Sequence, residues 1–335
     1  MLRTIRALKA SPQGFRWLAL ITIVATYALV VLGGVVRVTE SGDACPDWPR
    51  CHGELLPPLE TAVLIEFSHR LLASLVGLLV LATAIFAWRQ RQPVLRWGAI
   101  AAVVLVVGQI VLGGVTVLSD LESSLVTAHL ALASALLATL LLVTLSSFDL
   151  RPAEAAEHRA SAASVRNLVA FAALATFALM LTGSYVSGSG AGLAFRDWPL
   201  FDGRLMPEAG RLAMIHATHR LAAAAVGLLL AYVAIRAWRS MAWHRPVTLG
   251  AALALVLYAA QVLVGAANVW TLLQPAASAA HLALAEALWV TLVGVILLAH
   301  AAAQPTAQRR IVAHAEPSPR PVEPAAEALP VGRPS

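Results

Sequence analysis

The chain alternates between long apolar runs and short polar segments. Eight runs are long enough to cross about 30 Å of hydrocarbon as helices; they lie near residues 17–36, 64–88, 97–118, 123–147, 167–187, 212–237, 246–270 and 277–300. Proline, glycine and charged residues gather between the runs rather than inside them. Because a single helix satisfies its own backbone hydrogen bonds in lipid, this pattern predicts an all-α bundle of eight transmembrane helices and not a β-barrel.

The composition is that of an integral membrane protein. Hydrophobic residues make up 59% of the 335 positions and charged residues 13%, and the mean hydropathy is +0.76, which excludes an ordinary soluble domain. The net charge of +6 raises the question of nucleic acid. The sequence has no basic patch with interleaved aromatic residues, so we expect no nucleic-acid partner and only the lipid bilayer around the helices.

The basic residues predict the orientation of the helices. They precede the first run and follow the second, sixth and last runs, and cytoplasmic segments carry the excess of Lys and Arg. Both termini are therefore predicted to be cytoplasmic, with residues 1–16 as the N-terminal segment and 301–335, rich in Pro, Ala and Glu, as a disordered tail. The first run has no small-residue cleavage site and is predicted to be a span rather than a cleaved signal. The basic residues are Arg3, Arg6, Lys9, Arg16, Arg89, Arg91, Arg96, Arg236, Arg239, Arg245, Arg309 and Arg310.

The second half of the chain repeats motifs of the first half. The offset is 150 residues for two motifs (197 − 47 and 219 − 69) and 152 for two others (261 − 109 and 281 − 129), which indicates an internal duplication. Four spans in each half give both halves the same orientation, so we expect two tandem four-helix bundles related by pseudo-two-fold symmetry along the membrane normal. These are residues 17–147 and 167–300, joined by a cytoplasmic linker, 148–166. The matching motifs are Asp47-Trp48-Pro49 with Asp197-Trp198-Pro199, His69-Arg70 with His219-Arg220, Gln109 with Gln261, and His129 with His281.

Four histidines occupy duplicated positions inside the apolar runs. Each half has one near the outer end of its second helix, His69 or His219, and one near the outer end of its fourth, His129 or His281. Both helices enter the membrane from the same side, so the two imidazoles lie at similar depth and can clamp a haem iron axially. The alternative for any single histidine is a hydrogen bond to a neighbouring helix, but four at duplicated positions favour ligation. A closed zinc or copper site would need more ligands.

Two pairs of polar residues near these histidines have two interpretations each. Arg70 and Arg220 either contact haem propionates or snorkel to the interface as anchors. Gln109 and Gln261 either hydrogen-bond between helices or approach the macrocycle.

The two halves differ at three matched positions close to these histidines. Only the first half has a carboxylate beside its ligand candidate; it can exchange protons, stabilise positive charge on a substrate carbon, or pair with an arginine structurally. The two cysteines lie in a predicted outer loop, where disulfides persist, and form either a staple over the first site or a redox relay. The differing positions are Glu66 against His216, Cys45 against Phe195, and Cys51 against Phe201.

The sequence resembles the haem A synthase family, of the bacterial type with eight transmembrane helices. The motifs are Cys-Pro-Asp-Trp-Pro-x-Cys-His-Gly at 45–53, Glu-x-x-His-Arg at 66–70, and the later histidines, and the resemblance covers roughly 17–300. It implies an oxidoreductase that oxidises the C8 methyl group of haem O to the formyl group of haem A for terminal oxidases. It also implies the site residues: His219 and His281 for a haem b cofactor, and Glu66, His69 and His129 for the haem O substrate, with Glu66 catalytic.

The resemblance also implies a setting for the protein. We expect a bacterial cell membrane, haem sites toward the outer face, an electron donor that the sequence does not identify, and links to haem O synthase and cytochrome oxidase assembly. The chain lacks the second cysteine pair of some family members, so any thiol chemistry depends on Cys45 and Cys51. If His216 faces inward, it competes with His219 as the iron ligand.

Two other functions remain open on the residues alone. One is a di-haem b-type cytochrome that passes electrons between quinol and an outer acceptor, because equivalent histidine pairs suit it equally well. The other is a haem carrier or assembly factor without catalysis. The difference between Glu66 and His216 favours an oxidase, since an electron carrier needs no carboxylate at one site only.

Overall fold

The structure is a computed structural model that describes residues 12–54, 57–90, 92–148, 150, 155–207 and 209–304. Several predictions concern residues outside these ranges. They are the basic residues Arg3, Arg6, Lys9, Arg91, Arg309 and Arg310, part of the predicted linker, and the predicted tail beyond residue 304.

Eight long helices make up the described part of the chain. Each is long and apolar enough to cross a membrane, which confirms the predicted all-α membrane fold. A short 3-10 helix, η1 (Ala191–Leu193), follows the fifth of them. The eight are α2 (Pro12–Val38), α3 (Thr61–Trp88), α4 (Pro93–Leu118), α5 (Ser123–Ser146), α6 (Ala156–Gly188), α7 (Arg211–Ser240), α8 (Arg245–Trp270) and α9 (Pro275–Ala303).

Helix α6 begins earlier than the apolar run predicts. It starts at Ala156, inside the stretch 148–166 that the sequence predicts as a linker. Its first turns carry polar residues, but Ala162 and Val165 are buried in the core of the second half, and the His158 ring stacks on Trp243 at 4.4 Å. These few apolar contacts stabilise the extra turns, and a hydropathy window does not detect them.

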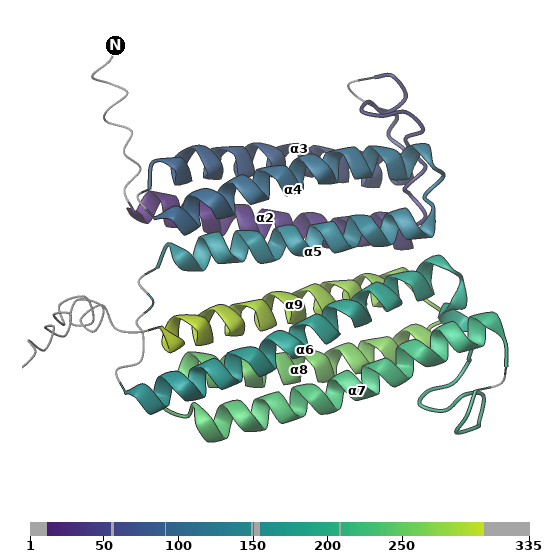
Figure 1. Ribbon diagram of the computed structural model, residues 1–335. Coiled ribbons are helices and arrows are strands. Elements are labelled where there is room, and N and C mark those ends of the chain that lie inside the picture. Colours follow the sequence, from purple (N-terminus) through teal and green to yellow (C-terminus); the bar gives the residue numbers. More distant parts are fainter. Residues whose placement is uncertain are drawn as a thin grey trace, which may run out of the picture.

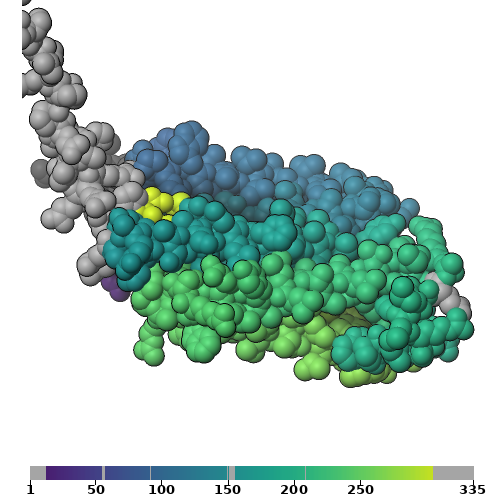
Figure 2. All heavy atoms as spheres, turned by 60° about the horizontal axis from the view of Figure 1, so that its bottom comes forward, coloured from purple at the N-terminus to yellow at the C-terminus, as the bar shows by residue number. Residues whose placement is uncertain are grey.

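The helices form two groups of four that lie side by side (Figure 1). Within each group consecutive helices contact one another, and the first helix also contacts the fourth: α2 packs on α5, and α6 packs on α9. Between the groups, α5 packs on both α6 and α9, and α2 packs on α9. The space-filling view shows the two groups in contact along the helices (Figure 2). This pattern agrees with two tandem bundles; the pseudo-two-fold axis stays a prediction.

Both long loops lie at the same end of the molecule, which we call the loop end (Figure 1). They follow α2 and α6, and each is folded around the aspartate of the repeated Asp-Trp-Pro motif. In each loop the aspartate carboxylate accepts two backbone hydrogen bonds. These bonds lower the pKa of Asp47 and of Asp197 below the usual value, and the bond from the glycine has the largest effect. The donors are His52 (2.6 Å) and Gly53 (2.8 Å) to Asp47, and Asp202 (2.8 Å) and Gly203 (2.7 Å) to Asp197.

Candidate haem sites

The four histidines lie at matched depths below the loop end. His69 and His219 each come eight residues after the first residue of α3 or α7 (69 − 61 and 219 − 211), and His129 and His281 each come six residues into α5 or α9 (129 − 123 and 281 − 275). At about 1.5 Å per residue, all four lie roughly two turns deep. His69 and His129 lie on the second and fourth helices of the first half, and His219 and His281 lie on those of the second half.

Each of these imidazoles packs directly against a glycine of a neighbouring helix. A Cβ atom added at any of the four glycines would lie closer to the ring than ordinary van der Waals contact, so a larger residue would displace the ring. The glycines are themselves duplicated (183 − 33 = 150 and 265 − 113 = 152). The distances from the added Cβ are 3.1 Å from Gly33 to His69 Nε2, 3.0 Å from Gly183 to His219 Cε1, 3.2 Å from Gly113 to His129 Cε1, and 3.0 Å from Gly265 to His281 Cε1.

Two of the imidazoles have an unsatisfied nitrogen. The Nδ1 atoms of His129 and His281 are buried and have no hydrogen-bond partner among the described residues. A buried polar atom without a partner is costly, and its occurrence at equivalent positions in both halves points to a bound group. Nitrogen donors in pairs, with each imidazole packed on a glycine, fit a haem.

Glu66 is buried between α3 and the loop above it. The residue is 3% exposed, and Oε1 accepts hydrogen bonds from Arg70 Nε (3.1 Å) and Nη2 (2.5 Å). Oε2 accepts one from the backbone N–H of Cys45 (3.3 Å). The carboxylate is therefore held between a cation and the disulfide-bonded loop, three residues before His69.

Arg70 and Arg220 fix the loops onto the helices. Besides Glu66, Arg70 donates to the carbonyl oxygens of Cys45 (2.9 Å), Asp47 (2.7 Å) and Arg50 (2.5 Å). Arg220 donates to the carbonyl oxygens of Asp197 (3.0 Å) and Leu200 (2.8 Å). Each guanidinium thus donates both to backbone carbonyls of the loop and to the side chain four residues before it, Glu66 or His216, and the propionate contacts stay a prediction.

His216 takes the place of Glu66 in the second half, both in sequence and in contacts. Its Nε2 accepts a hydrogen bond from Arg220 Nε (3.1 Å), and its ring lies 5.5 Å from that of Phe195. His219, by contrast, packs on Gly183, in the way that His69 packs on Gly33 in the first half. This arrangement favours His219 over His216 as the ligand.

Cys45 and Cys51 form a disulfide bond with a Cα–Cα distance of 4.7 Å, which confirms the predicted pairing. Both are buried, beside Val63 and Phe67 of α3. In the other loop Phe195 and Phe201 pack edge to face at 4.9 Å. The aromatic pair therefore occupies the position that matches the disulfide, and each pair lies in the long loop of its own half.

Gln109 contributes to packing between helices. Its Nε2 donates to the backbone carbonyl of His129 at 2.9 Å, which ties α4 to α5. The Oε1 atoms of Gln109 and Gln261 are buried without a partner in the described part of the chain. The amide therefore supports the helix that carries His129, and its approach to a macrocycle stays a prediction.

The sequence reasoning missed Glu286, a fully buried carboxylate between the two halves. Its Oε1 accepts a hydrogen bond from Ser134 Oγ at 2.6 Å, whereas Oε2 is buried without a partner among the described residues. Ser134 and Glu286 stand at matched positions of the two halves (286 − 134 = 152), although their residue types differ. Helices α5 and α9 therefore contact each other through equivalent positions. The available signal was a carboxylate inside an apolar run, five residues after His281.

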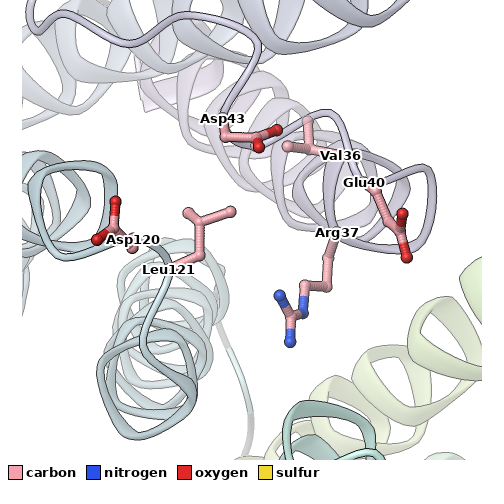
Figure 3. Close-up of a pocket in the computed structure, with 7 residues that line it drawn as sticks. Val36, Arg37, Glu40, Asp43, Asp120 and Leu121 are labelled. Atoms are coloured by element: carbon pink, nitrogen blue, oxygen red, sulfur yellow. The ribbon is translucent and has the colours of Figure 1, made fainter.

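A polar cavity of about 290 Å³ lies at the loop end of the first half (Figure 3). Arg37 reaches in from the end of α2, and Asp43 and Asp120 come from the two loops beside it. None of the four histidines lines it, so it is separate from the imidazole pairs. The lining residues are Val36, Arg37, Glu40, Gly42, Asp43, Asp120 and Leu121.

Fold and site together define a multi-pass helical membrane protein with a histidine pair suited to haem in each half. Residues 16–293 match the model of the COX15-CtaA family, described as cytochrome oxidase assembly protein, and the chain belongs to this family. Curated relatives include the haem A synthase of Shouchella clausii, which is 32% identical over 267 residues, covering 77% of this chain and 88% of the relative. The haem A synthase of Geobacillus kaustophilus is 30% identical over 292 residues, covering 86% and 92%.

Proposed function

We propose that this protein is a haem A synthase that oxidises the C8 methyl group of haem O to a formyl group. Family membership supports an enzyme of haem A biosynthesis. The observation that carries the finer proposal is the difference between two otherwise matched histidine sites. A buried carboxylate, Glu66, stands beside the pair of the first half, and His216 stands there in the second.

We assign haem b to His219 and His281, and haem O to His69 and His129. Haem ligation by the histidines is supported by the glycine contacts of all four rings and by the buried Nδ1 atoms of His129 and His281, and the division between haem b and haem O by the difference between Glu66 and His216. When bound, haem b supplies a redox-active iron for the oxidation. The histidines orient the two ring systems, and the loops exclude water from above.

Glu66 is the residue that we expect to act on the substrate. Its position three residues before His69 puts both on one side of α3, and Arg70 with the Cys45 N–H fixes its rotamer. A fixed carboxylate can accept a proton from a group on the reacting carbon of the substrate, or it can stabilise positive charge that develops on that carbon. The second half has no acid at the matched position, so it is assigned the resident haem.

The proposal includes an orientation in the membrane. The ends of the helices opposite the loop end carry Arg16, Arg89, Arg236 and Arg239, and an excess of arginine favours the cytoplasmic side. We therefore assign the loop end and both haem sites to the outer face of a bacterial cell membrane. Haem O synthase and the cytochrome oxidase assembly process are the expected partners, and the electron donor is to be identified.

Production of haem A from haem O tests the proposal. We expect haem O and haem A, alongside haem B, in pigment extracted from the protein purified from cells that supply haem O and have no other source of haem A. Haem B alone at both sites in every preparation would instead identify a di-haem b-type cytochrome.

A further inference from the structure

The second half holds its first histidine with a hydrogen bond that the first half lacks. Thr182 Oγ1 on α6 lies 3.0 Å from His219 Nδ1. Thr182 directly precedes Gly183, the glycine on which the same ring packs. The matched residue of the first half is Leu32 (182 − 150), directly before Gly33. Leucine offers no acceptor, and among the described residues the His69 ring has no equivalent bond.

The direction of this hydrogen bond follows from the single proton of the threonine hydroxyl. Thr182 Oγ1 also lies 2.8 Å from the carbonyl oxygen of Leu179, one turn earlier on α6, and a threonine inside a helix normally donates to such a carbonyl. With its proton used there, Oγ1 accepts from Nδ1–H of His219. This tautomer, assigned from the hydrogen-bond network, leaves the Nε2 lone pair free to bind a metal.

We propose that Thr182 is a positioning residue that fixes the tautomer and ring orientation of His219 and thereby tunes the haem of the second half, whereas Leu32 leaves His69 without this support. The inference rests on the proposed function in taking His219 as a haem ligand. A hydrogen bond at the non-ligating nitrogen orients the ring and raises its basicity as a ligand, which favours the oxidised iron.

The difference between the halves matches their proposed roles. A cofactor haem must stay bound through many turnovers, so an oriented and more basic ligand suits it. A substrate haem must enter and, after oxidation, leave. A histidine that packs on Gly33 and has no such hydrogen bond within the described chain can reorient at lower cost, because no hydrogen bond of this kind has to break.

Thr176 provides a matched control on the same helix. Like Thr182 it donates to a carbonyl of its own helix, that of Ala172 at 2.8 Å, and it is buried at 2% exposure. Its hydroxyl has no bond to a histidine. The same threonine-to-valine change therefore removes a helix-bonded hydroxyl at both positions, buried at Thr176 and half-buried at Thr182, but a contact with His219 at Thr182 only.

The experiment measures the midpoint potential and the ferric electron paramagnetic resonance spectrum of the purified full-length protein. A His129→Ala background removes a ligand candidate of the first half, so that the low-spin signal reports the second. We expect Thr182→Val to shift the midpoint potential to more positive values and to change the spectrum. The shift is expected to be up to a tenfold change in the ratio of oxidised to reduced haem, which is about 59 mV for one electron. Thr182→Ser keeps the hydroxyl and is expected to restore both, and Thr176→Val to change neither.

An unchanged potential and spectrum in Thr182→Val would overturn the inference. If that variant does not fold, Leu32→Thr in a His281→Ala background tests the same chemistry, because it is expected to lower the potential of haem bound to the first half; no shift there would also overturn it. Pigment extraction separates this failure from that of the proposed function. A protein that still makes haem A but shows no shift loses only the role of Thr182, whereas haem B alone removes the synthase and leaves the role of Thr182 standing.

Discussion

At the scale of single residues, the site depends on small differences between two copies of one plan. Histidine, glycine and arginine recur at fixed offsets, while Glu66 and His216 stand at one position with different chemistry. Both accept a hydrogen bond from the arginine four residues later. The loop contact is therefore common to both halves, and only the carboxylate is particular to the first.

We expect Glu66→Gln to retain bound haem and to reduce haem A production at least about 100-fold, the lower range for a lost acid or base. The amide keeps the size of the side chain but cannot take up a proton from the substrate. Pigment extraction is expected to show haem O or a hydroxylated form in place of haem A. His216→Gln is the control, with conversion close to normal. Normal haem A output from Glu66→Gln would remove this residue from the mechanism.

We expect Gly183→Ala to weaken haem binding in the second half, because the new methyl group would lie 3.0 Å from His219 Cε1. The low-spin absorption of that haem should fall in proportion to the lost occupancy. Gly77→Ala is the control: its added Cβ meets no atom within 4 Å, and alanine favours a helix by about 1 kcal/mol over glycine. Equal haem content in the two variants would show that the glycine does not position the ring.

At the scale of helices, polar contacts between α2, α5 and α9 join the two halves. Tyr27 Oη donates to the carbonyl oxygen of Ala283 at 2.8 Å, and Trp289 Nε1 donates to that of Ser134 at 2.9 Å. Ser134 also donates to Glu286. In lipid such bonds stabilise helix association together with close packing, so this cluster fixes how the two bundles meet.

We expect Ser134→Ala to lower the free energy of unfolding by about 1–3 kcal/mol, because it leaves both oxygens of buried Glu286 without a partner. Thermal unfolding in detergent, followed by circular dichroism, measures the change. Thr139→Val on the same helix is the control, since the bond of the Thr139 hydroxyl within the described residues is to the Ala135 carbonyl of its own helix. A Ser134→Ala variant as stable as the control would mean that Glu286 needs no partner.

The loops at the loop end should lose their fold as pH falls. Hydrogen bonds from Gly53 and His52 hold the pKa of Asp47 below its usual value, so the carboxylate stabilises the loop above the unfolded pKa of about 3.9. This contribution disappears as pH falls through the lower folded pKa. We expect cleavage of the loop by an acid protease to rise in that window. In Asp47→Asn the cleavage rate, divided by that of an unstructured peptide at the same pH, should be independent of pH, and a pH profile equal to the parent's would contradict the assignment.

At the scale of the whole molecule, the sequence predicts the number of spans, the duplication and the matched depth of the histidines. These features depend on hydropathy and on spacing, which a linear pattern records. The roles of Arg70 and Arg220 in the loops depend on carbonyls 20 or 23 residues away, and loop conformation is not visible in spacing. The pairing of Ser134 with Glu286 likewise requires knowing which faces of α5 and α9 meet.

The same limit applies to the start of α6. Its polar first turns are stabilised by Ala162, Val165 and the His158–Trp243 stack, and none of these contacts raises the local hydropathy. Tertiary packing overrides the local pattern there.

The central claim is that one half holds the haem that reacts and the other holds the haem that stays. The most direct test compares the pigments of His129→Ala and His281→Ala, purified from cells that supply haem O. We predict that His129→Ala loses haem O and haem A but keeps low-spin haem B, and that His281→Ala loses the low-spin haem B signal. Loss of haem B from His129→Ala, with haem O and haem A retained, would contradict the assignment of the two halves.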